Sequence, residues 1–141
     1  MCSVVGGWWL AVGLQSPGMA YDTLADRIVT FGGYDGSNIV NTTWYWDAGG
    51  WHQASPTSPA VARYDFGMAY DPVRNRSVVF GGEDSSFNLV SDVYEYNEAT
   101  WAKISPLAGP DPRTGLSLVY NPDAQRVMVF GNSASLSGED L

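Results

Sequence analysis

Short apolar runs separated by turn residues recur along this chain, and they predict strands. Residues 28–31 and 77–80 are β-branched or aromatic without alternation, which is typical of strands covered on both faces. Residues 43–46 and 93–96 place an aromatic side chain at every second position, as in a strand with one face against a neighbouring sheet. No segment shows a sustained 3.6-residue apolar stripe, so we expect no helix.

These runs belong to a repeat of about 50 residues. Tyr-Asp, a turn and an apolar run ending in Phe-Gly-Gly occur at residues 21–33 and 70–82, and a variant ending in Phe-Gly-Asn occurs at residues 120–132. One position of the repeat holds an arginine in every unit: Arg27, Arg76 and Arg126. Such regular self-similarity indicates one structural unit used several times.

Each unit is expected to contain four antiparallel strands. In the second unit they fall at residues 67–70, 76–81, 92–96 and 101–104. Asp-Pro and Asn residues favour tight turns between them, and Gly-Gly or Asn-Glu closes the later hairpin. Four antiparallel strands per repeat of 40 to 50 residues predict the blade of a β-propeller, and we label the strands A to D.

The repeat also predicts what is buried. Strand B ends in a phenylalanine that should lie between sheets, at Phe31, Phe80 and Phe130. Aromatic residues of strands C and D should form the core as well: Trp44, Trp46, Trp51, Tyr94, Tyr96 and Trp101. Paired glycines follow strand B, and at least one of the four should have positive φ or meet a neighbouring strand: Gly32, Gly33, Gly81 and Gly82.

The order of these residues resembles a kelch repeat. The resemblance rests on Arg63, Gly67-Met68-Ala69-Tyr70-Asp71, Phe80-Gly81-Gly82, Tyr94-Glu95-Tyr96-Asn97 and Trp101. Residues 41–47 followed by 49–51 are similar to the variant of prokaryotic secreted kelch proteins of the galactose-oxidase central-domain type. Unit one departs from the pattern at Leu14 or Gln15, where the arginine should fall, and unit three departs at Asn132.

The resemblance implies an all-β, kelch-type β-propeller fragment, with two complete four-stranded blades and a partial blade at each end. Residues 4–12 are interpreted as strand D of a preceding blade, 16–56 as blade one, 63–106 as blade two and 113–132 as strands A and B of a third. Such an array leaves blade edges open. We therefore expect either a piece of a longer extracellular or cell-surface protein, or self-association through these edges.

The composition of the chain limits the classes of partner that we expect. The net charge is −8 with a single lysine, Lys103, which disfavours nucleic acid and anionic lipid. No apolar run approaches the length of a membrane-spanning helix. One cysteine, Cys2, and one histidine, His52, make a copper centre of the galactose-oxidase kind unexpected, and we predict no metal or cofactor. A Ser/His/Asp site lacks its Gly-x-Ser-x-Gly motif.

The loops after strand B and before strand A should emerge at one end of the blades, where binding usually resides. Nine residues there are candidates for ligand contact: Tyr34, Asp35, Asn38, Arg63, Glu83, Asp84, Phe87, Asn88 and Arg113. For the two arginines a structural role is the better hypothesis. The leading function is a non-enzymatic module that binds a protein or carbohydrate. The alternative is the interior of a carbohydrate-active kelch enzyme, an oxidase or epimerase, with its catalytic residues outside this chain.

Overall fold

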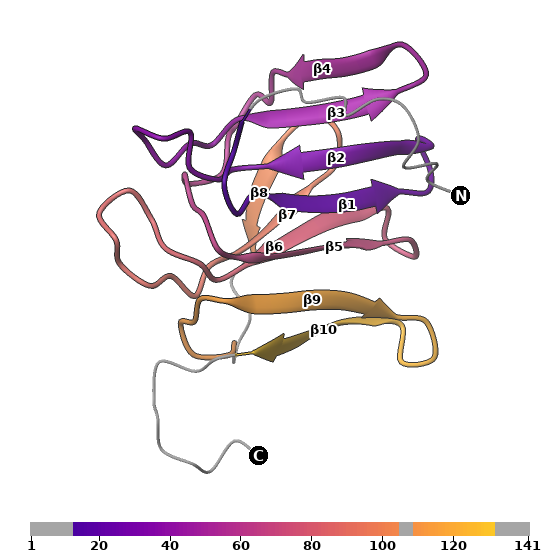
Figure 1. The fold of residues 1–141 in the computed structure, drawn as a ribbon. Coiled ribbons are helices and arrows are strands. Elements are labelled where there is room, and N and C mark those ends of the chain that lie inside the picture. The colour runs from indigo at the N-terminus through magenta and orange to yellow at the C-terminus, as the bar shows by residue number, and fades with distance from the viewer. Residues whose placement is uncertain (1–12, 105–108, 132–141) are drawn as a thin grey trace, which may run out of the picture.

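The computed structural model describes residues 13–104 and 109–131, and these form ten β-strands and no helix (Figure 1). The strand predicted at residues 4–12 lies outside the described residues. The strands are β1 (Gly18–Asp22), β2 (Arg27–Phe31), β3 (Thr43–Asp47), β4 (Gly50–Ala54), β5 (Gly67–Asp71), β6 (Arg76–Phe80), β7 (Val93–Tyr96), β8 (Trp101–Ile104), β9 (Leu116–Asn121) and β10 (Arg126–Gly131). The prediction of an all-β chain is confirmed.

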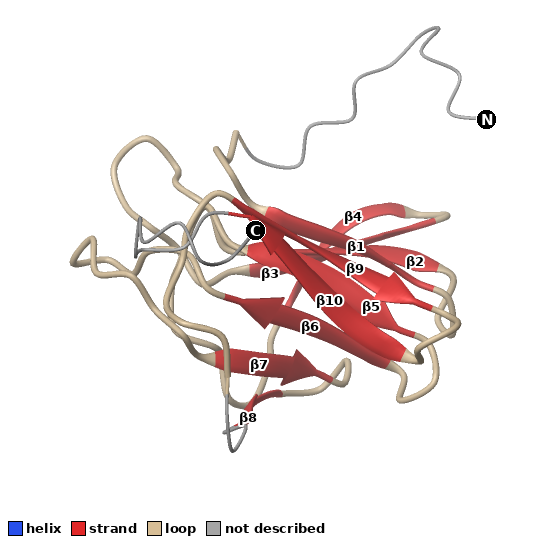
Figure 2. Cartoon of the chain, turned by 90° about the horizontal axis from the view of Figure 1, so that it is seen from below, coloured by secondary structure: helices blue, strands red, loops and turns tan. Residues whose placement is uncertain are grey.

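The strands form three antiparallel sheets in chain order. Sheet one is β1-β2-β3-β4, sheet two is β5-β6-β7-β8, and sheet three is the pair β9 and β10. The registers repeat, since Gly18 pairs with Phe31 in sheet one and Gly67 pairs with Phe80 in sheet two. The sheets lie side by side, β1 against β5 and β5 against β9. Seen from below, β7 and β8 extend beyond β10 (Figure 2).

The first hairpin of each unit is built by the same local chemistry. The last residue of the first strand accepts hydrogen bonds from two backbone N–H groups at its side-chain Oδ1, with N···O distances of 2.9–3.1 Å. These residues are Asp22, Asp71 and Asn121. The residue before the second strand has a left-handed backbone, with φ of 52° at Asp26, 53° at Asn75 and 51° at Gln125. Because the bonds lie within five residues, the turn forms wherever its sequence occurs.

Aromatic side chains fill the space between sheets one and two. Phe31 is fully buried and its ring centroid lies 4.6 Å from that of Trp101 and 5.7 Å from that of Phe66. Trp101 stacks on Tyr96 at 4.9 Å, and its Nε1 donates a hydrogen bond of 3.0 Å to the buried Thr43 Oγ1. Burial of such side chains is the main stabilising contribution to this interface.

The glycine pairs fasten neighbouring sheets together. The amide of Gly33 donates to the Arg63 carbonyl at 2.8 Å, and that of Gly82 donates to the Arg113 carbonyl at 2.7 Å. All four predicted glycines have positive φ, of 64° and 103° in unit one and 73° and 88° in unit two. A Cβ on Gly81 would lie 2.6 Å from the Arg113 carbonyl oxygen. The prediction of crowded, left-handed glycines is confirmed.

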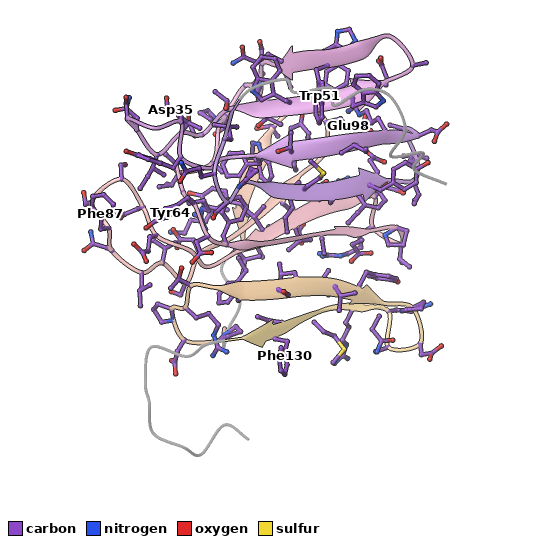
Figure 3. The ribbon with its side chains drawn as sticks, viewed as in Figure 1. Asp35, Trp51, Tyr64, Phe87, Glu98 and Phe130 are labelled. Atoms are coloured by element: carbon purple, nitrogen blue, oxygen red, sulfur yellow. The ribbon has the colours of Figure 1, made fainter. Side chains whose placement is uncertain are left out.

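The prediction that Phe130 is buried is wrong. Its side chain is 85 % exposed and points away from the other sheets, whereas Phe31 and Phe80 are buried (Figure 3). All three occupy the same face of their own sheet, the face toward the following sheet. Within the described residues nothing follows β10, so the third phenylalanine has no cover.

The predicted aromatic core is correct only in unit two. Trp44, Trp46 and Trp51 are half-buried, while their equivalents in sheet two, Tyr94, Tyr96 and Trp101, are buried. Side chains alternate along a strand, and Thr43 and Tyr45 of β3 face sheet two, so the two tryptophans of β3 face the opposite way. That face of sheet one has no described sheet against it.

Candidate functional site

The long loops after β2 and β6 lie at one end of the sheets, opposite the short hairpin turns (Figures 1 and 3). We call these two loops, residues 32–42 and 81–92, the loop face. Seven of the nine predicted contact residues belong to it: Tyr34, Asp35, Asn38, Glu83, Asp84, Phe87 and Asn88. The repeat therefore gathers two homologous loops on one end of the molecule.

In the first loop an aspartate organises the backbone. Oδ1 of Asp35 accepts the amides of Ser37 at 2.8 Å and Asn38 at 2.7 Å. These hydrogen bonds, that of Asn38 first, hold the pKa of Asp35 below its usual value, so the carboxylate stays ionised. Tyr34 forms β-bridges with both Gln15 and Ile39, and its hydroxyl donates to the Gly36 carbonyl at 2.8 Å.

The second loop repeats this arrangement with one more residue. Oδ1 of Asp84 accepts the amides of Ser86 at 2.8 Å and Asn88 at 3.0 Å, and these bonds, that of Asn88 first, lower the pKa of Asp84. The neighbouring Glu83 accepts a hydrogen bond of 3.0 Å from the Tyr64 hydroxyl. This bond is the largest cause of the raised pKa of Tyr64.

Tyr64 bonds to this loop but is not among the nine predicted contact residues. It forms a β-bridge with Glu83 in unit two, and the equivalent bridge in unit one joins Gln15 to Tyr34. A tyrosine and a polar side chain are thus paired across the same bridge in both units, with their positions exchanged. The repeat spacing identifies these two bridges as equivalent, because position 64 lies 49 residues after position 15 and position 83 lies 49 residues after position 34.

Phe87 is the most unusual residue of the loop face. Its side chain is 69 % exposed, and its backbone φ of 61° lies in the left-handed region. Glycine and asparagine adopt this region readily, but other residues are strained there by about 1–2 kcal/mol. The Phe87 amide donates to the Asp84 carbonyl at 2.9 Å and so closes the turn. The turn therefore holds an apolar ring in solvent at a conformational cost.

No protein-family model matches the sequence, and no curated protein does. Within residues 13–104 and 109–131, no three His, Cys, Asp or Glu side chains are grouped as metal ligands. His52 is exposed; its ring stacks on Tyr45 at 5.1 Å between centroids, and its Nε2 lies 3.2 Å from Asp47 Oδ1. Across the same described residues there is no helix of the length and apolar character that a membrane span requires.

The two predicted arginines bond to backbone carbonyls of the chain itself, and Arg113 is partly exposed. Arg63 is fully buried, and its Nη1 donates to the carbonyls of Gly81 at 3.1 Å and Asp92 at 3.3 Å. Burial lowers its pKa. Arg113 repeats the bond in unit three, with Nη1 3.4 Å from the Gly131 carbonyl. Both arginines therefore bond to the end of strand B in their own unit, in agreement with the structural role favoured for them from the sequence.

Proposed function

We propose that this protein is a kelch-type β-propeller module without catalytic activity, and that it binds a protein or a carbohydrate through the loop face. Three antiparallel sheets in chain order, joined by the same glycine-to-carbonyl hydrogen bonds at each boundary, support the propeller assignment. The recurring arginine and glycine positions support the kelch assignment. Arg63 and Arg113 each bond to the end of strand B in their own unit, and Gly33 and Gly82 each donate to the backbone of the next unit.

The observation that carries the binding proposal is Phe87. Phe87 combines an exposed bulky side chain with a positive φ, and backbone strain of this kind concentrates at functional sites. An aromatic ring presented on a rigid turn loses little conformational entropy when a ligand covers it. The hydrogen bonds of Asp84 supply that rigidity.

The polar side chains on the loop face indicate which chemical groups a ligand of Phe87 would carry. Ionised Asp35 and Asp84 and the amide side chains of Asn38 and Asn88 offer hydrogen-bond acceptors and donors on the same end of the molecule. A sugar ring can stack its C–H face on Phe87 and direct its hydroxyl groups to these side chains. A peptide with an apolar side chain next to a basic one fits the same pattern.

Two variants of Phe87 test the proposal against a panel of immobilised neutral oligosaccharides and a library of short basic-apolar peptides. Phe87→Ala should weaken binding of any probe that the wild type retains by about tenfold or more. Phe87→Gly should weaken it equally while it leaves the melting temperature unchanged or raises it, because glycine relieves the positive φ.

The matched control is Val73→Ala, because Val73 is 59 % exposed in the β5–β6 turn at the opposite end of the sheets. This variant should bind as the wild type does. Equal binding by Phe87→Ala and wild type would overturn the assignment of the loop face, and so would retention of no probe by the wild type.

A further inference from the structure

A cleft of about 530 Å³ lies between sheet two and sheet three. One wall belongs to β6 and β7 and the other to β9 and β10. Most of its lining is apolar: Val78, Phe80, Val93, Leu118, Val127 and Val129. Its rim is charged, since Arg74 pairs with Asp71 at 2.8 Å and with Glu95, and Arg126 lies opposite.

The equivalent space between sheets one and two is filled. Tyr94 and Tyr96 of β7 and Trp101 of β8 occupy it, and Trp101 packs on Phe31 at 4.6 Å. Phe80 is the repeat equivalent of Phe31, and it lines the open cleft instead. The cleft between sheets two and three therefore corresponds to the space between sheets one and two. There, the aromatic residues of β7 and β8, the third and fourth strands of sheet two, fill that space.

Within residues 13–104 and 109–131, the backbone of β10 has the matching unpaired edge. In sheet two, residues 77–80 of β6 pair with residues 93–96 of β7. The equivalent residues of β10 are 127–130, and among the described residues β10 pairs with β9 alone. An unpaired strand edge beside an apolar cleft is the arrangement that accepts an added strand, with backbone hydrogen bonds on the edge and side chains in the cleft.

We propose that the β10 edge and this cleft form a second binding site, for a β-hairpin with aromatic side chains at alternate positions of one strand and a tryptophan on the other. This is the chemistry of β7 and β8, which fill the equivalent space in sheet two. The aromatic side chains enter between Phe80 and Val129, and the first strand of the hairpin pairs with β10. The site is separate from the loop face and does not depend on the function proposed for it.

The probe is a synthetic peptide with the sequence of residues 92–104, which span β7 and β8. Titrated into the ¹⁵N-labelled protein, it should bind saturably and shift the amide signals of β10 and β6. A control peptide with Tyr94→Ala, Tyr96→Ala and Trp101→Ala should bind at least about tenfold more weakly, because it retains the backbone but not the anchors. Equal binding by both peptides, or binding by neither, would overturn the proposal.

A pair of protein variants locates the site. Val129 faces the cleft, and its chain neighbour Met128 lies on the opposite face of β10 and is 48 % exposed. Val129→Arg should abolish peptide binding and Met128→Arg should preserve it, while amide exchange in β5 and β6 shows that each remains folded. If Val129→Arg binds as wild type does, the cleft is not the site. Phe87→Ala should bind the peptide normally, which separates this test from that of the loop face.

A second copy of the chain is the competing occupant. Sedimentation without peptide distinguishes the two cases. Concentration-dependent association that Val129→Arg removes, together with an absence of peptide binding, would assign the cleft to contacts between copies and overturn the hairpin proposal.

Discussion

Substituting Gly81 by alanine should separate sheet two from sheet three. Gly81 has a φ of 73°, and a Cβ built on it lies 2.6 Å from the Arg113 carbonyl oxygen and 2.6 Å from a Leu116 methyl carbon. No real Cβ contact is this short, so the backbones must move apart. The movement strains the neighbouring hydrogen bond from the Gly82 amide to the same Arg113 carbonyl, now 2.7 Å long.

The expected cost has three parts. A left-handed backbone costs a non-glycine residue about 1–2 kcal/mol. Overpacking in a well-packed contact costs about 1–3 kcal/mol, and loss of a hydrogen bond costs about 0.5–1.5 kcal/mol. The free energy of unfolding should therefore fall by about 3–6 kcal/mol. At about 4 °C per kcal/mol this is a fall in melting temperature of roughly 12–24 °C.

Gly36→Ala is the matched control. Gly36 also has a positive φ, of 97°, but a Cβ on it would meet nothing within 4 Å. Gly36→Ala shares with Gly81→Ala the cost of a positive φ at alanine and the lower entropy of the unfolded chain. It lacks the close contact of the Cβ with a neighbouring sheet. Urea unfolding followed by circular dichroism should show a loss of about 1–2 kcal/mol for Gly36→Ala, well below that for Gly81→Ala. Equal losses in the two variants would refute the argument that close approach of the sheets requires glycine at position 81.

Four further outcomes are expected. Thr43→Val should cost about 1–3 kcal/mol in urea unfolding, because the buried Trp101 Nε1 loses its acceptor; an unchanged midpoint would contradict this. Burial, followed by the hydrogen bond with the Asp22 carboxylate, raises the pKa of Tyr70 to about 12, so the stabilising contribution of Tyr70 should be complete below pH 10, the ordinary value, and be lost as the pH rises toward 12; Tyr70→Phe should lessen the decline of stability over this range, as measured by urea unfolding. Phe80→Ala should cost about 3–5 kcal/mol and Phe130→Ala less than about 0.5, as measured by thermal unfolding, since only Phe80 is buried. Sedimentation should show self-association through the exposed Phe130 face that strengthens with added salt, because screening weakens repulsion between copies of net charge −8.

Much of the fold is readable from the sequence because its causes are local. The turns at residues 22–26, 71–75 and 121–125 form from hydrogen bonds within five residues. The glycine pairs need positive φ wherever strand B ends, and the repeat period identifies equivalent strands without reference to their neighbours. The loop face was predicted for the same reason, since loop direction follows from strand order.

Burial was decided by the tertiary structure. Alternation assigns Trp44 and Tyr94 to the same face of their sheets, yet only Tyr94 is buried, because another sheet lies against it. Phe130 occupies the same position in the repeat as Phe80, but it is exposed because no described sheet lies against its face. A side chain's exposure depends on contacts with segments distant in the chain, and no local pattern contains them.

The candidate sites divide in the same way. The acidic loops and Phe87 were predicted from position and residue type, but the positive φ of Phe87 is set by how a loop one residue longer closes on Asp84. Arg63 was placed among the loops by sequence and is buried in the structure, where its side chain holds strand ends instead of facing solvent. Local chemistry determined which elements form, and the packing of one sheet on the next determined which side chains remain available to bind.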